Sequence, residues 1–211
     1  MKTRKRKNQA PRKTMLIVGA NEKEALFFSQ VRKDARYANL SVDWAGGETD
    51  LEKLISIASK KRTQGKFNEV WLVFSFKDLN VDVDRVKELI PVAERKRVHL
   101  CWSNPGINLW YLFHFRGANG LITDSDSIDR AIQREIPNFK NTAIYLKTEG
   151  LDFYKMICVK DNDANRNART YNEAVESVLG LPAINYIDLH LAIIKNCGAA
   201  NFTQNQRTIG M

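Results

Sequence analysis

Polar residues follow three apolar stretches in the first half of the chain, and their types bear on phosphate chemistry. The runs are Gly19-Ala20-Asn21-Glu22-Lys23, Ser75-Phe76-Lys77-Asp78 and Ser103-Asn104-Pro105-Gly106-Ile107-Asn108. A metal-dependent phosphodiesterase needs several converging carboxylates to hold the cation that polarises the phosphate and activates water. These runs contain only two acids, Glu22 and Asp78, so they supply too few carboxylate ligands for a divalent cation.

The same runs suit an anion better than a divalent cation. The ammonium of Lys77 repels Mg²⁺ and attracts phosphate, and hydroxyl and amide groups accompany it in these runs. We therefore expect no metal and no cofactor here. We predict instead a neutral-to-positive ligand-binding pocket made by Lys23, Ser75, Lys77, Ser103, Asn104 and Asn108.

An alternative interpretation keeps metal chemistry. A divergent nuclease would hold Mg²⁺ or Mn²⁺ with Glu22 and Asp78, supported by one or more of Glu24, Asp82 and Asp84. His114 is a further catalytic candidate, but no carboxylate lies near it in sequence to orient its ring. A hydrogen-bonded structural histidine is the simpler interpretation of that residue.

The elements that must position these residues alternate between strand and helix. Nearly continuous apolar runs predict buried strands over 14–19, 40–44, 69–74 and 98–102. Helical spacing predicts helices over 22–34, from about 50 to 64 and over 83–95, with another starting at Pro105. This alternation predicts an α/β fold with a mainly parallel sheet covered by helices. In such sheets the working site lies beyond the carboxyl ends of the strands.

The second half of the chain is more helical and more polar. Helices are predicted over 126–135, 172–179 and 186–196, while 161–169 is expected to form a loop or a helix start. The predicted organisation is a basic flexible tail over 1–13 and an α/β core over 14–116. A helical extension of the same domain follows over 117–197, and a frayed tail over 198–211 completes the chain.

Basic charge is concentrated in the tail. The first thirteen residues hold seven Lys and Arg residues and no acid, so a net charge of +9 leaves only +2 for the rest of the chain. Such a tail suits contacts with nucleic-acid phosphates, and a solvated leader is the equally weighted alternative. The residues assigned to phosphate contact are Lys5, Arg6, Lys7, Arg12 and Lys13.

Several classes of protein are disfavoured by the sequence. No apolar run approaches the ~18–20 residues of a membrane span, and the amino terminus does not resemble a signal peptide. The three cysteines are far apart in sequence, so local zinc-binding spacing is absent and reduced thiols are expected. A cytoplasmic location and no membrane partner are predicted, and the oligomeric state is left open.

A longer pattern resembles a known family. The run SNPGINLWYLFHF from Ser103 to Phe115 resembles the signature of RloB-like proteins, in which Ser-Asn-Pro is followed by Leu-Trp and His-Phe. The start PRKTMLIV and the run EVWLVF also resemble that family, and the resemblance covers roughly residues 10–195. It implies a Toprim-type core, a phage-defence or abortive-infection context, and an ABC-type ATPase as a possible partner.

The acidic positions depart from the family's pattern. The resemblance implies a glutamate at Ala20, aspartates at Ser75 and Lys77, and a glutamate at Asn108. The apolar framework persists while these four positions have lost their acids together. We therefore predict a pseudo-nuclease that acts by binding nucleic acid, a nucleotide or a partner protein. The divergent Mg²⁺- or Mn²⁺-dependent nuclease is the alternative.

Overall fold

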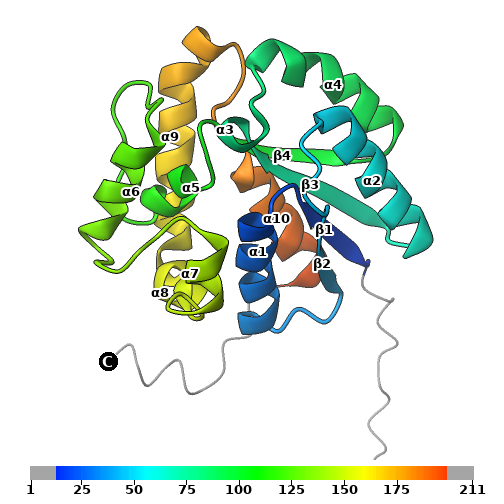
Figure 1. The fold of residues 1–211 in the computed structure, drawn as a ribbon, viewed down its shortest axis with the longest axis horizontal. Coiled ribbons are helices and arrows are strands. Elements are labelled where there is room, and N and C mark those ends of the chain that lie inside the picture. The colour runs from blue at the N-terminus through cyan, green and yellow to red at the C-terminus, as the bar shows by residue number, and fades with distance from the viewer. Residues whose placement is uncertain (1–12, 199–211) are drawn as a thin grey trace, which may run out of the picture.

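A four-stranded sheet forms the centre of the protein, in a computed structural model that describes residues 13–198. The strands are β1 (Met15–Gly19), β2 (Leu40–Trp44), β3 (Glu69–Ser75) and β4 (His99–Ser103). They lie in the order β2-β1-β3-β4, and every pairing is parallel (Figure 1). The predicted α/β class, with a helix-covered parallel sheet and a helical C-terminal region, is confirmed.

Both faces of the sheet are covered, which explains the continuous apolar runs of its strands. Met15 and Ile17 face a cluster that includes α1 (Glu22–Asp34), whereas Leu16 and Val18 face the opposite cluster. That second cluster contains α2 (Leu51–Gln64), α3 (Phe76–Leu79) and α4 (Val83–Arg95). Helices α1, α2 and α4 therefore act as crossovers that carry the chain back to the start of the next strand.

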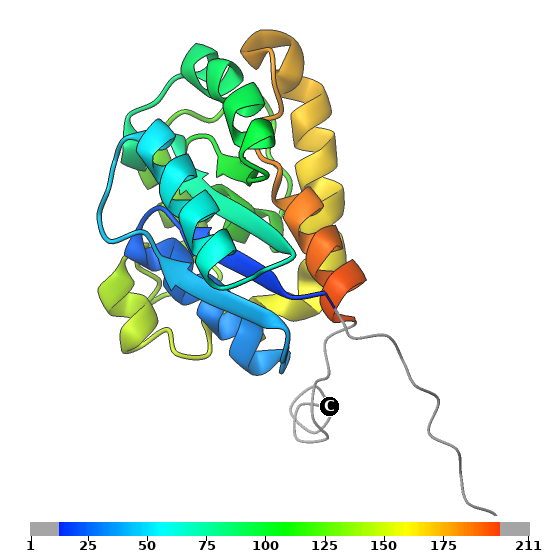
Figure 2. The same ribbon diagram turned by 90° about the vertical axis from the view of Figure 1, so that its right-hand side faces the viewer.

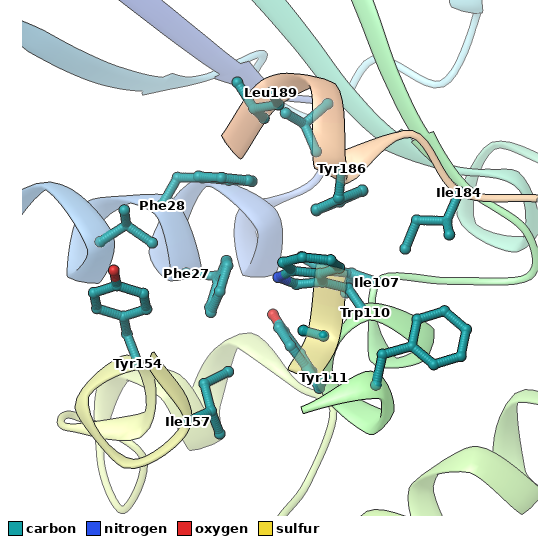
Figure 3. Packing of buried hydrophobic residues seen from close by; sticks show 14 of the residues in the cluster. Phe27, Phe28, Ile107, Trp110, Tyr111, Tyr154, Ile157, Ile184, Tyr186 and Leu189 are labelled. Atoms are coloured by element: carbon teal, nitrogen blue, oxygen red, sulfur yellow. The ribbon is translucent and has the colours of Figure 1, made fainter. Parts of the chain in front are cut away.

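The second half of the chain adds a helical layer beside α1. Its elements are α5 (Asn108–Phe113), α6 (Ser125–Gln133), α7 (Ala143–Lys147), α8 (Phe153–Ile157), the 3₁₀ turn η1 (Cys158–Lys160), α9 (Asp161–Leu179) and α10 (Tyr186–Cys197). Figure 2 shows α9 and α10 along one side of the molecule. Aromatic rings fill the space between this layer and α1, and Tyr186 stacks at 5.9 Å on both Phe28 and Trp110 (Figure 3).

The structure corrects some predicted boundaries. Of the two alternatives for 161–169, the helix start is the one observed: the helix predicted over 172–179 begins at Asp161 as α9, and Ala164, Ala168, Tyr171 and Val175 form one buried stripe along it. The helix expected from Pro105 begins at Asn108, and β4 is displaced by one residue from the predicted 98–102. The predicted division of the chain stays a prediction, and most of both tails (1–12 and 199–211) lies outside the described residues.

None of the helices between residues 13 and 198 has the length and apolar character that a membrane span requires.

One asparagine covers the open side of the outer strand β4. The Asn185 side chain accepts a hydrogen bond from Trp102 N at 2.6 Å and donates one to Leu100 O at 2.9 Å. Its own backbone N–H donates to Trp102 O at 3.2 Å. Asn185 thus satisfies backbone groups that an edge strand would otherwise leave unpaired.

We expect Asn185→Ala to lower the free energy of unfolding by about 1–3 kcal/mol, because it leaves a partly buried backbone donor and acceptor without partners. Urea unfolding monitored by circular dichroism measures this loss. The control is Asn162→Ala, an exposed position on α9, which should change stability by less than about 0.5 kcal/mol. Equal effects of the two substitutions would contradict the role of Asn185.

Candidate functional site

Three strands end side by side, and the polar runs that follow them meet at what we call the carboxyl edge of the sheet. Ser75 and Ser103 are register partners at the ends of β3 and β4. Gly19, the last residue of β1, pairs with Val73, and Ala20 N donates to Val73 O at 2.8 Å. The chain leaves this edge through α1, α3 and the loop before α5.

A fully buried carboxyl group, that of Glu24, lies beneath this edge. It forms a capping box with Asn21: Asn21 Oδ1 accepts from Glu24 N at 3.0 Å, and Glu24 Oε2 accepts from Asn21 N at 3.3 Å. Its other oxygen accepts from Ser75 Oγ at 2.7 Å. Ser75 Oγ in turn accepts from Ile107 N at 3.2 Å and lies 3.5 Å from Ser103 Oγ. One side chain thereby connects the start of α1 with the ends of β3 and β4.

Burial raises the pKa of Glu24 from 4.5 to about 8, although the Ser75 hydrogen bond opposes the shift and the neighbouring Asp78 adds to it. The carboxyl group is therefore mostly protonated and neutral at pH 7. In that state it neither attracts a divalent cation nor accepts a proton from a nucleophile.

Asp78, the acid that follows β3, is held by two residues from the start of α1. Lys23 Nζ lies 3.2 Å from Asp78 Oδ1 and 3.0 Å from Oδ2, and Asn21 Nδ2 donates to Oδ2 at 2.6 Å. The Lys23 and Asp78 side chains are only 18% and 27% exposed, so solvent screens this pair less than a surface pair. An ammonium group thus neutralises the carboxylate best placed to attract a metal ion.

Further acids reach the carboxyl edge from α6, and no local sequence pattern predicts their presence there. Asp126 lies 3.7 Å from Lys77 Nζ, and Asp129 Oδ1 accepts from Asn108 Nδ2 at 2.6 Å. Burial raises the pKa of Asp129, and the Asn108 hydrogen bond opposes that shift. These acids lie more than twenty residues beyond β4 in sequence, so only the tertiary fold brings them here.

The six predicted ligand-binding residues occupy this edge, but they differ in accessibility. Ser75, Ser103 and Asn108 are fully buried, and Lys23 is bound to Asp78. Asn108 donates to Ser125 O and Oγ, while its own Oδ1 is buried without a partner. The Lys77 side chain is 58% exposed, and Asn104 is half-buried. Ligand contact by the three buried residues would require movement and stays a prediction.

The alternative catalytic residues are also engaged. Glu22 accepts from Lys147 Nζ at 2.5 Å, and Asp78 is paired with Lys23. Across residues 13–198, no three or more His, Cys, Asp or Glu side chains gather in an arrangement that could hold a metal ion.

His114 has an orienting carboxylate, which comes from a residue distant in sequence. Its Nδ1 lies 2.9 Å from Trp110 O, and its Nε2 lies 3.1 Å from Asp161 Oδ1, which comes from a residue 47 positions later. His114 is 1% exposed and packs edge-to-face on Trp110. Asp161 also lines a nearby aromatic cavity of about 30 Å³ with Trp110 and His190. These contacts join the end of α5 to the start of α9, and a catalytic role of His114 stays a prediction.

The predicted phosphate contacts of the tail are not tested, because Lys5, Arg6, Lys7 and Arg12 lie outside the described residues. Lys13 is described and exposed.

The model of a family described as RloB-like protein matches residues 15–179, which is more than half of the chain. No curated protein and no solved structure matches.

Glu24→Gln is expected to stabilise the protein at neutral pH. The folded-state pKa of Glu24 is about 8 against an ordinary 4.5. The contribution of protonated Glu24 to the free energy of unfolding is therefore complete below pH 4.5, and it is lost as pH rises towards 8. At pH 7 the neutral amide avoids a cost of about 3 kcal/mol. Urea unfolding of both proteins between pH 5 and pH 8 measures the effect. Stability curves that stay parallel across this range would contradict a buried, protonated Glu24.

Proposed function

This chain belongs to the RloB-like family, and from that premise we propose that it acts by binding a phosphate-bearing ligand rather than by metal-dependent cleavage. The proposed binding site is the carboxyl edge of the sheet. The proposed setting is phage defence in the cytoplasm, as the resemblance to the family's signature implies.

The Lys23–Asp78 pair is the observation that carries this proposal. A divalent cation at a phosphodiesterase site is held by ionised carboxylates that are free to coordinate it. Here the Asp78 carboxylate has an ammonium within 3.2 Å of both of its oxygens and an amide donor within 2.6 Å. A metal ion would have to displace Lys23 or bind beside its positive charge. Both routes are electrostatically unfavourable.

Lys77 is the residue most available to a phosphate group. Its side chain is 58% exposed, and its partner Asp126 is 75% exposed at 3.7 Å, so this pair is loose and solvent-screened. An arriving phosphate can compete for such an ammonium at little cost. Lys77 immediately follows the buried Phe76 in α3, which fixes its backbone at the edge.

A metal-dependent nuclease is the second candidate, and α6 supplies the observation in its favour. Asp126 and Asp129 add carboxylates to the edge that already carries Glu22 and Asp78. Withdrawal of Lys23 and Lys77 would leave several acids at one edge. An ABC-type ATPase, which the family resemblance implies as a partner, would be a candidate cause of such a rearrangement.

A cleavage and retention assay separates the two candidates. We expect plasmid, single-stranded DNA and tRNA to remain intact with the full chain in Mn²⁺ or Mg²⁺, while immobilised ATP retains the protein. Lys77→Ala should weaken ATP retention about tenfold, which corresponds to one charge-assisted hydrogen bond. The matched control is Lys140→Ala, because the Lys140 side chain is similarly exposed, at 65%.

Cleavage that requires the metal and disappears in Asp78→Ala would support the nuclease instead. Equal ATP retention by the two lysine variants would reject the carboxyl edge as the ligand site.

A further inference from the structure

Three helices end with a cationic residue in the left-handed backbone conformation. Arg36 follows α1, Lys66 follows α2 and Arg97 follows α4, with φ angles of 56°, 54° and 55°. Residues other than glycine and asparagine seldom adopt this backbone conformation, because their Cβ atom crowds the following carbonyl oxygen. The recurrence at three successive crossover helices calls for a common explanation.

The three endings share one hydrogen-bond pattern, the Schellman motif. The backbone N–H groups of Arg36, Lys66 and Arg97 donate to the carbonyl oxygens of Lys33, Thr63 and Glu94, each three residues back. The next residue donates five residues back, from Tyr37 to Arg32, from Phe67 to Arg62 and from Val98 to Ala93. The motif places an apolar residue against the helix and favours glycine at the left-handed position. In this protein an arginine or a lysine occupies that left-handed position at each of the three helix ends.

The same chain uses glycine or asparagine at other left-handed helix ends. Gly180 follows α9 with a φ of 76°, and Asn80 follows α3 with a φ of 50°. Glycine at the three cationic positions would relieve the crowding. Arg or Lys at these positions thus places a long cationic side chain at each helix end at some cost in backbone strain.

Favourable interaction with the helix dipole does not account for these residues. Cations near a helix carboxyl end are stabilising, but the last turns already hold them: Arg32 and Lys33 in α1, Lys61 and Arg62 in α2, and Arg95 in α4. These positions are helical and carry no left-handed strain.

Topology brings the three cations to one side of the molecule, which we call the amino edge of the sheet. Arg36, Lys66 and Arg97 precede β2, β3 and β4, and Lys13 precedes β1, so one of these basic residues lies shortly before each parallel strand. With the strand order β2-β1-β3-β4, the four residues succeed one another along the edge as Arg36, Lys13, Lys66 and Arg97. Arg36 reaches this edge from the face of the sheet that α1 covers, whereas Lys66 and Arg97 reach it from the face that α2 and α4 cover.

These four side chains are available for binding. All four residues are exposed, and within residues 13–198 none of them takes part in an ion pair that the structure records. Two of the acids nearby are engaged elsewhere. Asp34 is buried beside Lys33 and Lys155, and Glu69 accepts from Trp71 Nε1 and Asn196 Nδ2. Glu94 is exposed and partly offsets the positive charge.

We propose that Lys13, Arg36, Lys66 and Arg97 form a row that contacts successive phosphates of a nucleic-acid backbone. A row of cations matches the regular negative charge of a nucleic-acid strand, and it carries no base-specific element. The sequence places six more basic residues directly before Lys13. This row lies opposite the carboxyl edge, so it is distinct from the ligand site proposed above and does not depend on it.

The test combines binding and stability in two triple variants of the full chain. Arg36→Gly, Lys66→Gly and Arg97→Gly together remove the charges and the backbone strain. The corresponding three glutamine substitutions remove the charges alone. Binding to a duplex DNA is measured by fluorescence anisotropy at several salt concentrations, and thermal unfolding is measured in parallel.

Both variants should bind the duplex at least about tenfold more weakly at low salt, and the dependence of log K on log salt should flatten by about 2 to 3. Only the glycine variant should melt higher, by about 2–6 °C, because it alone relieves the left-handed positions. The charge-matched control replaces Arg130, Arg166 and Arg169 on α6 and α9 by glutamine, and it should bind as the wild type does.

Unchanged duplex affinity in the glycine and glutamine variants would overturn the proposal. So would an equal loss in the control variant, since that would reflect net charge alone. Vesicles of anionic lipid are the comparison ligand, and a selective loss of vesicle binding with duplex binding retained would also reject it. Retention on immobilised ATP tests the carboxyl edge, and duplex binding tests the row at the amino edge, so either proposal can fail without the other.

Discussion

The two acidic side chains nearest the centre of the carboxyl edge are each neutralised within the protein, Glu24 by keeping its proton and Asp78 by pairing with Lys23. Glu24 is buried and keeps its proton, because ionisation in that position would cost desolvation energy that Ser75 and Asn21 repay only in part. Asp78 is paired with Lys23 and accepts a hydrogen bond from Asn21. The two acids nearest the centre of the edge are therefore satisfied from within the protein. This constraint connects the local capping of α1 to the packing of β3 and β4, and it leaves little free charge for a cation.

The two edges of the sheet differ in how their basic residues are used. At the carboxyl edge, Lys23 and Lys77 each have an acidic partner, Glu22 is paired with Lys147, and Asp129 accepts a hydrogen bond from Asn108. At the amino edge, Arg36, Lys66 and Arg97 end the crossover helices in a conformation that favours glycine. In a parallel sheet the crossovers all return to the same edge, so a recurring helix ending becomes a row of side chains. The proposed ligand site and the proposed nucleic-acid surface are thus separated by the length of the strands.

Local pattern predicted the sheet and its crossovers well, because periodicity and capping act over a few residues. Both α1 and α4 have the predicted bounds, and α2 runs from Leu51 to Gln64, close to the predicted range. Contacts across long sequence separations were not predictable. The burial of Glu24 depends on Ser75, 51 residues away, and the orientation of His114 depends on Asp161. The positions of the α6 acids and of the left-handed cations were also not predictable from local sequence, because the tertiary fold determines which edge of the sheet they reach.

Manganese binding measures whether the acids at the carboxyl edge are already neutralised within the protein. Mn²⁺ would be titrated into the full chain near pH 7, with electron paramagnetic resonance measuring the concentration of free ion. If Lys23 neutralises Asp78, the free-ion signal rises as it does in buffer, with no stoichiometric site. Loss of one equivalent of the signal, restored in Asp78→Asn, would show instead that a metal ion reaches Asp78 despite Lys23.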